Sequence, residues 1–245
     1  MDLKPLAVAS CCVLALSFAA CQDMARMLVE KPKEEAPWKR NILAAKIQPS
    51  EAGQPPTAEL SQLLERAGAV PGVKAVAAVD ILPGVTPFRQ KTPYAIRQDG
   101  NSVDLTDGLL RSVSLGYFRA MEIRLLQGRE FSAMDGEHFV PVAIVDESYA
   151  KKIWPRQSAL GQRMSLHKTG PWATVVGVVQ DGPGAQGTPE LYFPLAQYAL
   201  HGQDVQSRPW FVIAHVTGDP KDVAPALSRA VGRDFQDLGT WLKKL

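Results

Sequence analysis

The stretch PVAIVDESYAKKIWP, residues 141–155, sets an apolar run directly against a short amphipathic segment. The apolar run is typical of a buried strand, and the segment after it has the spacing of a helix. Asp146, Glu147 and Ser148 lie at the junction. Two interpretations follow from this arrangement. Adjacent carboxylates beside a hydroxyl could form a catalytic corner, or they could cap the helix.

The cap is the better interpretation, because every residue of the stretch then has a structural task. An N-cap needs a side-chain acceptor for the free amides of the first turn, and Asp146 supplies one. Glu147 in that first turn suits the positive end of the helix dipole. We therefore expect no catalytic role for this carboxylate. If Asp146 is a cap, asparagine should serve nearly as well at this position.

Outward from this stretch, strand and helix patterns alternate in places but do not repeat regularly. The clearest helix starts at Thr57 and is stopped by Pro71-Gly72, and a second one starts at Asp219-Pro220. Strands are predicted at 41–49, 73–83, 93–100, 109–116, 140–146, 161–168, 172–181, 191–198 and 210–217. Residues 117–136 are predicted to form one helical turn, a short strand and a loop. The predicted fold class is therefore α+β, with two small lobes of sheet and helix.

The composition of the 245 residues excludes several classes of protein. Hydrophobic residues make up 46% and charged residues 21%, which are ordinary globular values. The net charge is +2 and no run of basic residues exceeds two, so the sequence does not predict nucleic-acid binding. All three cysteines lie between residues 11 and 21, which leaves the rest of the chain without a disulfide.

Motifs for catalysis or metal binding are not found in the sequence. The four histidines, His138, His167, His201 and His215, lack metal-ligand spacing. The segment DGPGAQG, residues 181–187, lacks the lysine and hydroxyl of a phosphate-binding loop and is predicted to be a turn. No G-x-S-x-G elbow is present. We therefore predict no catalytic, cofactor-binding or metal-binding residues, and no enzyme.

The N-terminus, MDLKPLAVASCCVLALSFAAC, has a short polar start and an apolar run of 15 residues from Leu6 to Ala20. That length fits a signal-peptide core and is short for a membrane span of about 20 residues. The small residues before Cys21 are typical of a lipoprotein signal, in which the cysteine receives lipid after residues 1–20 are removed. Two alternatives stay open: an uncleaved membrane anchor, and ordinary secretion or no export.

Residues 21–40 are mixed in charge, contain two prolines after Cys21 and are predicted to be a tether. By analogy with other lipoproteins, Gln22 favours the outer membrane, since it is not the aspartate that commonly signals retention at the inner membrane. We expect a protein on the periplasmic side of the cell envelope, anchored to a membrane through its N-terminus.

Six segments in order carry a family resemblance: LLERAGAVPGVKAVAAVDILP, SLGYFRAMEIRLLQGREFSAMD, PVAIVDESYAKKIWP, ALGQRM, ATVVGVVQD and ELYFPLAQ. Their order and spacing resemble the periplasmic core domain of MacB-type ABC permeases over residues 41–236. The resemblance implies a porter-like lobe built from the early and late parts of the chain, with a smaller α/β lobe inserted near 116–200. An asparagine commonly occupies the position of Asp146 in that family.

The resemblance also implies a domain without catalytic residues, placed between two membrane helices, that passes movement from an ATPase to periplasmic partners. The printed sequence has one N-terminal membrane signal and neither a second span nor an ATPase. Because a lever must be held at two points, we expect an accessory or binding module that docks on a permease, an adaptor or an exported substrate. The alternative is a truncated remnant of a split permease.

We predict lipid attachment at Cys21. Mass spectrometry of the membrane-extracted protein should show a mature chain that begins with a diacylated Cys21. A mature chain that still begins with Met1 would contradict this prediction.

Overall fold

The computed structural model describes residues 41–47, 57–84, 92–96, 102–105, 108–165, 170–182, 188–197 and 210–242. They belong to one compact unit, Trp38–Leu245. The predicted signal peptide, Cys21 and the predicted tether lie outside the described residues.

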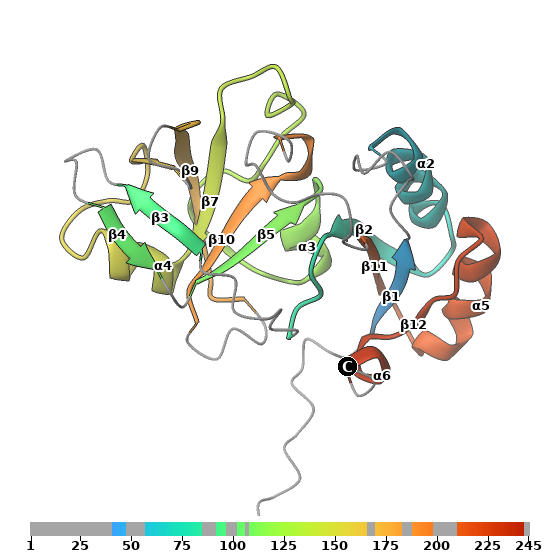
Figure 1. Ribbon diagram of the computed structural model, residues 1–245. Helices are drawn as coiled ribbons and strands as arrows, with labels where there is room; N and C mark the ends of the chain where they lie inside the picture. The colour runs from blue at the N-terminus through green and yellow to red at the C-terminus, as the bar shows by residue number, and fades with distance from the viewer. Residues whose placement is uncertain are drawn as a thin grey trace, which may run out of the picture. The chain divides into compact units, whose positions relative to one another are not determined.

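A ten-stranded mixed sheet forms the framework of this unit (Figure 1). Its strands are β1 (Ile42–Ile47), β2 (Val73–Val79), β5 (Leu109–Val113), β6 (Leu125–Gly128), β7 (Val142–Asp146), β8 (Arg163–Met164), β9 (Ala173–Val179), β10 (Glu190–Pro194), β11 (Trp210–Val216) and β12 (Gln236–Asp237). They are ordered β12-β1-β11-β2-β5-β10-β7-β9-β6, with β8 paired to β9. A separate hairpin consists of β3 (Thr92–Ile96) and β4 (Ser102–Leu105).

In the part of the chain that the structure describes, two long helices and three short ones accompany the sheet. They are α2 (Thr57–Gly68), α3 (Tyr117–Ala120), α4 (Glu147–Ile153), α5 (Pro220–Val231) and α6 (Leu238–Leu242). Helices α2 and α5 contact each other and lie beside β1 and β11 (Figure 1). None of the helices in the described ranges combines the length and apolar character that crossing a membrane requires.

Strand alternation places β1 between two apolar layers. Leu43 and Ile47 join a cluster with the inner faces of α2 and α5, whereas Ile42 and Ala44 join a second cluster that includes α3. This alternation follows from the two-residue period of a strand. A third cluster packs α4 against β7, β9 and β10.

The sheet narrows where β2 meets β5. Val79 and Val113 are the single registered pair between these strands. On one flank Ala78 and Ser114 exchange two hydrogen bonds, and on the other Asp80 and Ser112 do so, each pair using one side-chain acceptor. The Ser114 and Asp80 side chains therefore supply the acceptors that continue the hydrogen-bond ladder on either side of the single registered pair. We call these residues, 78–80 and 112–114, the joint.

The α+β fold class is confirmed, and so are most elements near their predicted bounds. The helix predicted from Thr57 to Val70 ends at Gly68, and the strand predicted at 161–168 is described only as β8. The short strands β4 and β12 were not predicted. The two-lobed division and the insertion near 116–200 stay predictions. The strands on the far side of the joint begin with β5 at Leu109, which comes before the predicted insertion boundary near residue 116.

We predict that Leu63→Asp destabilises the fold strongly. Leu63 lies on the buried face of α2 and is 3% exposed. A buried unpaired charge costs several kcal/mol, against a total stability of about 5–15 kcal/mol. Urea unfolding should show a large loss, whereas Gln62→Asp on the exposed face of the same helix should change little. Equal free energies of unfolding for both variants would contradict this assignment.

Candidate interaction surface

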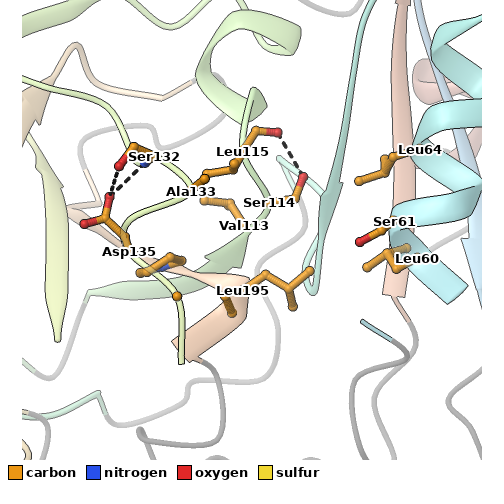
Figure 2. Close-up of a pocket in the computed structure, with 13 residues that line it drawn as sticks. Leu60, Ser61, Leu64, Val113, Ser114, Leu115, Ser132, Ala133, Asp135 and Leu195 are labelled. Carbon is orange, nitrogen blue, oxygen red and sulfur yellow. Dashed lines mark hydrogen bonds between the residues drawn. The ribbon is translucent and has the colours of Figure 1, made fainter. Parts of the chain in front are cut away.

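A pocket of about 210 Å³ lies between α2 and the far side of the joint (Figure 2). Its lining comes from α2, the end of β5, a loop after β6 and the end of β10. These residues are Leu60, Ser61, Leu64, Val113, Ser114, Leu115, Ser132, Ala133, Asp135, Gly136, Pro194, Leu195 and Ala196. In Figure 2 the side chains of Leu60 and Leu64 point from α2 toward the pocket, with Ala133 and Leu115 opposite.

The pocket is suited to an apolar group. Most of its lining side chains are apolar, and two of its polar side chains are engaged within the protein. The Ser114 hydroxyl accepts from the Ala78 N–H and donates to the Leu115 carbonyl. The Asp135 carboxylate is bound by Arg129 and Ser132. Leu115, at 48% exposure, brings a further apolar side chain to the surface beside the pocket.

The loop of residues 129–141, between β6 and β7, is held by an ion pair. Arg129 donates from both terminal nitrogens to the Asp135 carboxylate, at 2.7 and 2.8 Å. The Ser132 N–H donates to the same carboxylate at 2.8 Å. Burial alone would raise the pKa of Asp135, but these hydrogen bonds outweigh it and lower the pKa. The carboxylate is therefore ionised, and it links Asp135 to Arg129 and Ser132 within the first half of the loop.

Gln197, fully buried at the end of the segment after β10, holds the second half of this loop. Its amide nitrogen donates to the carbonyls of Gly136 and Val140, both at 3.2 Å. Its amide oxygen accepts from the Val142 N–H at 3.0 Å. One side chain thus binds three backbone groups between residues 136 and 142.

The exposed residues of this held loop include three large apolar ones, beside the polar Glu137 and His138. Met134, Phe139 and Val140 are 66%, 50% and 71% exposed. Scattered exposed apolar residues are normal on a protein surface. Here, three of the five large hydrophobic residues that are exposed in the described ranges lie within seven positions of one loop. We call Met134, Phe139 and Val140 the apolar tip. Together with the pocket it forms the candidate interaction surface.

A second polar cluster lies wholly inside the protein, beside the joint. Arg111 on β5 pairs with Glu190 on β10 at 2.8 Å and donates to the carbonyls of Ile81 and Leu82. The Tyr192 hydroxyl donates to the other carboxylate oxygen of Glu190. Burial alone would lower the pKa of Arg111, but the Glu190 carboxylate holds it above its usual range. At 1% exposure for Arg111 and Glu190, this cluster is a structural clamp and not a binding site.

Asp146 caps α4 as predicted, and it also links α4 to β10. One carboxylate oxygen accepts from the Tyr149 N–H at 2.6 Å, which is the cap. The other accepts from the Glu190 N–H at 2.8 Å, across to β10. The residue is fully buried, and burial raises its pKa to about 7 despite these two donors. Asparagine has a single acceptor oxygen, so the expectation that it would serve nearly as well at this position needs revision.

The other candidate residues are not brought together. His138 is exposed within the loop, and His215 is buried on β11 with its Nδ1 3.7 Å from Glu122 Oε1. His167, His201 and residues 183–187 lie outside the described residues. Within the described ranges, no three His, Cys, Asp or Glu side chains are placed to hold a metal ion.

The sequence matches the MacB-like periplasmic core domain family over residues 8–231. The chain belongs to this family. No curated protein matches it.

Among solved structures, the chain is similar to the periplasmic region of MacB from Actinobacillus actinomycetemcomitans, with 18% identity and a TM-score of 0.55 over 83% of this chain and 92% of that one. It also matches the extracellular domain of the noncanonic ABC-type transporter YknZ from Gram-positive bacteria, at 19% identity and a TM-score of 0.49 over 80% and 98% of the two chains. A domain of a putative permease protein from Porphyromonas gingivalis matches at 17% identity and a TM-score of 0.49 over 82% and 87%.

The family is that of periplasmic domains of ABC transporter permeases, and this chain therefore has a transport-related role in the cell envelope. The resemblance carried by the six sequence segments is confirmed. The similarity to the MacB structure supports the α+β fold and says nothing about this chain's partners, since the identity is 18%.

We predict a distinctive pH dependence at Asp146. Its folded pKa of about 7 lies above the ordinary value of 3.8, so the folded state holds a proton that the unfolded state releases between these pH values. Stability contributed by Asp146 is therefore largest below pH 4 and is lost as the pH rises toward 7. Asp146→Asn does not titrate, so the wild type should lose stability relative to this variant over that range.

Urea unfolding of both proteins from pH 4 to 8 measures this difference. Asp146→Ala, which leaves the Tyr149 and Glu190 N–H groups without an acceptor, should cost about 1–3 kcal/mol. A difference between wild type and Asn variant that stays constant with pH would show that Asp146 remains ionised throughout.

Proposed function

We propose that this chain is a non-enzymatic binding module of an ABC-type export system, docking on a permease, an adaptor or an exported substrate. The observation that carries the proposal is the candidate interaction surface. An apolar pocket borders the loop that carries the apolar tip, and polar contacts of Asp135 and Gln197 hold this loop. A surface with fixed backbone and exposed apolar side chains is suited to recognition of another molecule.

The use of the buried polar groups supports a non-enzymatic role. Arg111 and Glu190 neutralise each other, and Asp146 accepts two backbone hydrogen bonds. Asp135 is held by an arginine and a serine. A general acid or base must reach a substrate, and these carboxylates are instead committed to the fold.

We further propose that the module works on the periplasmic side of the envelope, held to a membrane by lipid at Cys21, with the outer membrane favoured by Gln22. Attachment through the N-terminus suits docking on a partner.

The proposal predicts a specific complex in cells. The full chain, tagged at its C-terminus and extracted from membranes with mild detergent, should co-purify with a component of an ABC-type exporter. Quantitative mass spectrometry should find that component depleted when the tagged chain carries Leu63→Asp, which is expected to unfold the α2 face. An abundant, folded chain that enriches no transport component would favour a remnant of a split permease.

A further inference from the structure

We infer that the apolar tip binds a partner protein whose contact surface is apolar and rimmed by basic side chains. This inference rests on the proposed function and specifies which part of the surface makes the contact and what chemistry it meets.

The tip is preorganised for binding. Its supporting loop is fixed by the paired hydrogen bonds between Arg129 and Asp135 and by the three bonds of Gln197. Val140 is itself held through its carbonyl, while its side chain is 71% exposed. A partner therefore meets side chains on an ordered backbone and loses less free energy to ordering the loop.

The acidic residues of the loop indicate which charge the partner should carry. From Glu130 to Pro141 the loop contains Glu130, Asp135 and Glu137, and no lysine or arginine. Arg129 neutralises Asp135, so the segment keeps a net negative charge from the two glutamates. Complementary charge on the partner favours encounter and suppresses wrong partners. A basic rim around an apolar patch is the matching surface.

The same charges argue against two other occupants. An anionic lipid surface attracts basic segments, and an acidic loop is repelled from it. A second copy meeting this loop through a two-fold axis would place like charges together, because such an interface uses the same patch on both subunits. A different protein is the occupant that the charges favour.

The pocket extends the contact. Ala133 and Gly136, which flank Met134 and Asp135 in the loop, line the pocket, and Leu115 brings an exposed apolar side chain to its rim. An apolar side chain of the partner that enters this pocket lies beside the tip. One partner can therefore cover both features.

Photo-crosslinking in cells tests the contact on the full chain. A photoreactive amino acid is placed at Met134 or Val140, and as a control at Ser158, an exposed residue after α4. We expect the tip positions to capture the same envelope protein, identified by mass spectrometry, and the control position not to capture it. Binding of the purified, identified protein is then measured for the full chain and its variants.

Met134→Ser should weaken that binding by about tenfold, as expected for an exposed apolar anchor. Glu137→Lys should weaken it by about three- to tenfold at low salt and less at high salt, because salt screens the rim charges. Asp234→Lys makes the same charge change in an exposed turn after α5 and should leave binding unaltered. Circular dichroism checks that all three variants are folded.

Each contrary outcome has a separate meaning. Capture of the transport component only from Ser158 would overturn this inference and leave the proposed function standing. If the crosslinkers in the tip capture only lipid, or only another copy of the chain, the inference that the partner is a different protein is overturned. If Glu137→Lys leaves binding unchanged or strengthens it, the inference that the partner has a basic rim is overturned. Capture of no partner from any position would overturn the proposed function as well.

Discussion

Arg111, whose charge is paired with the buried Glu190, connects the two sides of the sheet where it is narrowest. Val79 and Val113 alone are in register between β2 and β5, and Arg111 spans this joint by donating to the Ile81 and Leu82 carbonyls and to Glu190. Loss of either partner would leave a buried charge unpaired, which typically costs 3–5 kcal/mol. The Glu190 N–H is bound in turn by Asp146, so the joint, β10 and the start of α4 depend on one connected set of polar contacts.

The candidate interaction surface inherits its geometry from this joint. One wall of the pocket is α2, which packs on β2, and the opposite wall follows β5 and β10. The distance between these walls is therefore set where β2 and β5 meet. Gln197 comes three residues after the end of β10, so the strand that carries Glu190 also positions the side chain that fixes the loop. The end of β10 lines the pocket, and Gln197 just after β10 holds the loop that carries the tip. Pocket and tip are therefore fixed relative to each other.

Local rules explain what could be predicted from the sequence. The apolar spacing of α2 and α5, the Asp219-Pro220 start and the Asp146 cap depend on neighbouring residues, and the structure contains each of them. The second hydrogen bond of Asp146 reaches a residue 44 positions away, and Gln197 reaches the loop from 57 and 61 positions away. Contacts of that range follow from strand order, which no local pattern reveals. An arginine inside the apolar run LLRSV was the available signal for the clamp, since a buried arginine requires an acidic partner.

The distribution of polar groups supports the proposal of recognition over catalysis. Catalytic sites use buried titratable side chains that remain available to a substrate, often with strongly shifted pKa values. Asp146 has such a shifted pKa, yet both of its oxygens accept backbone hydrogen bonds in a fully buried position. A perturbed pKa is therefore no sign of catalysis here. The polar interactions of Asp135 and Gln197 fix the backbone of the loop, and its exposed apolar side chains are suited to contact with another molecule.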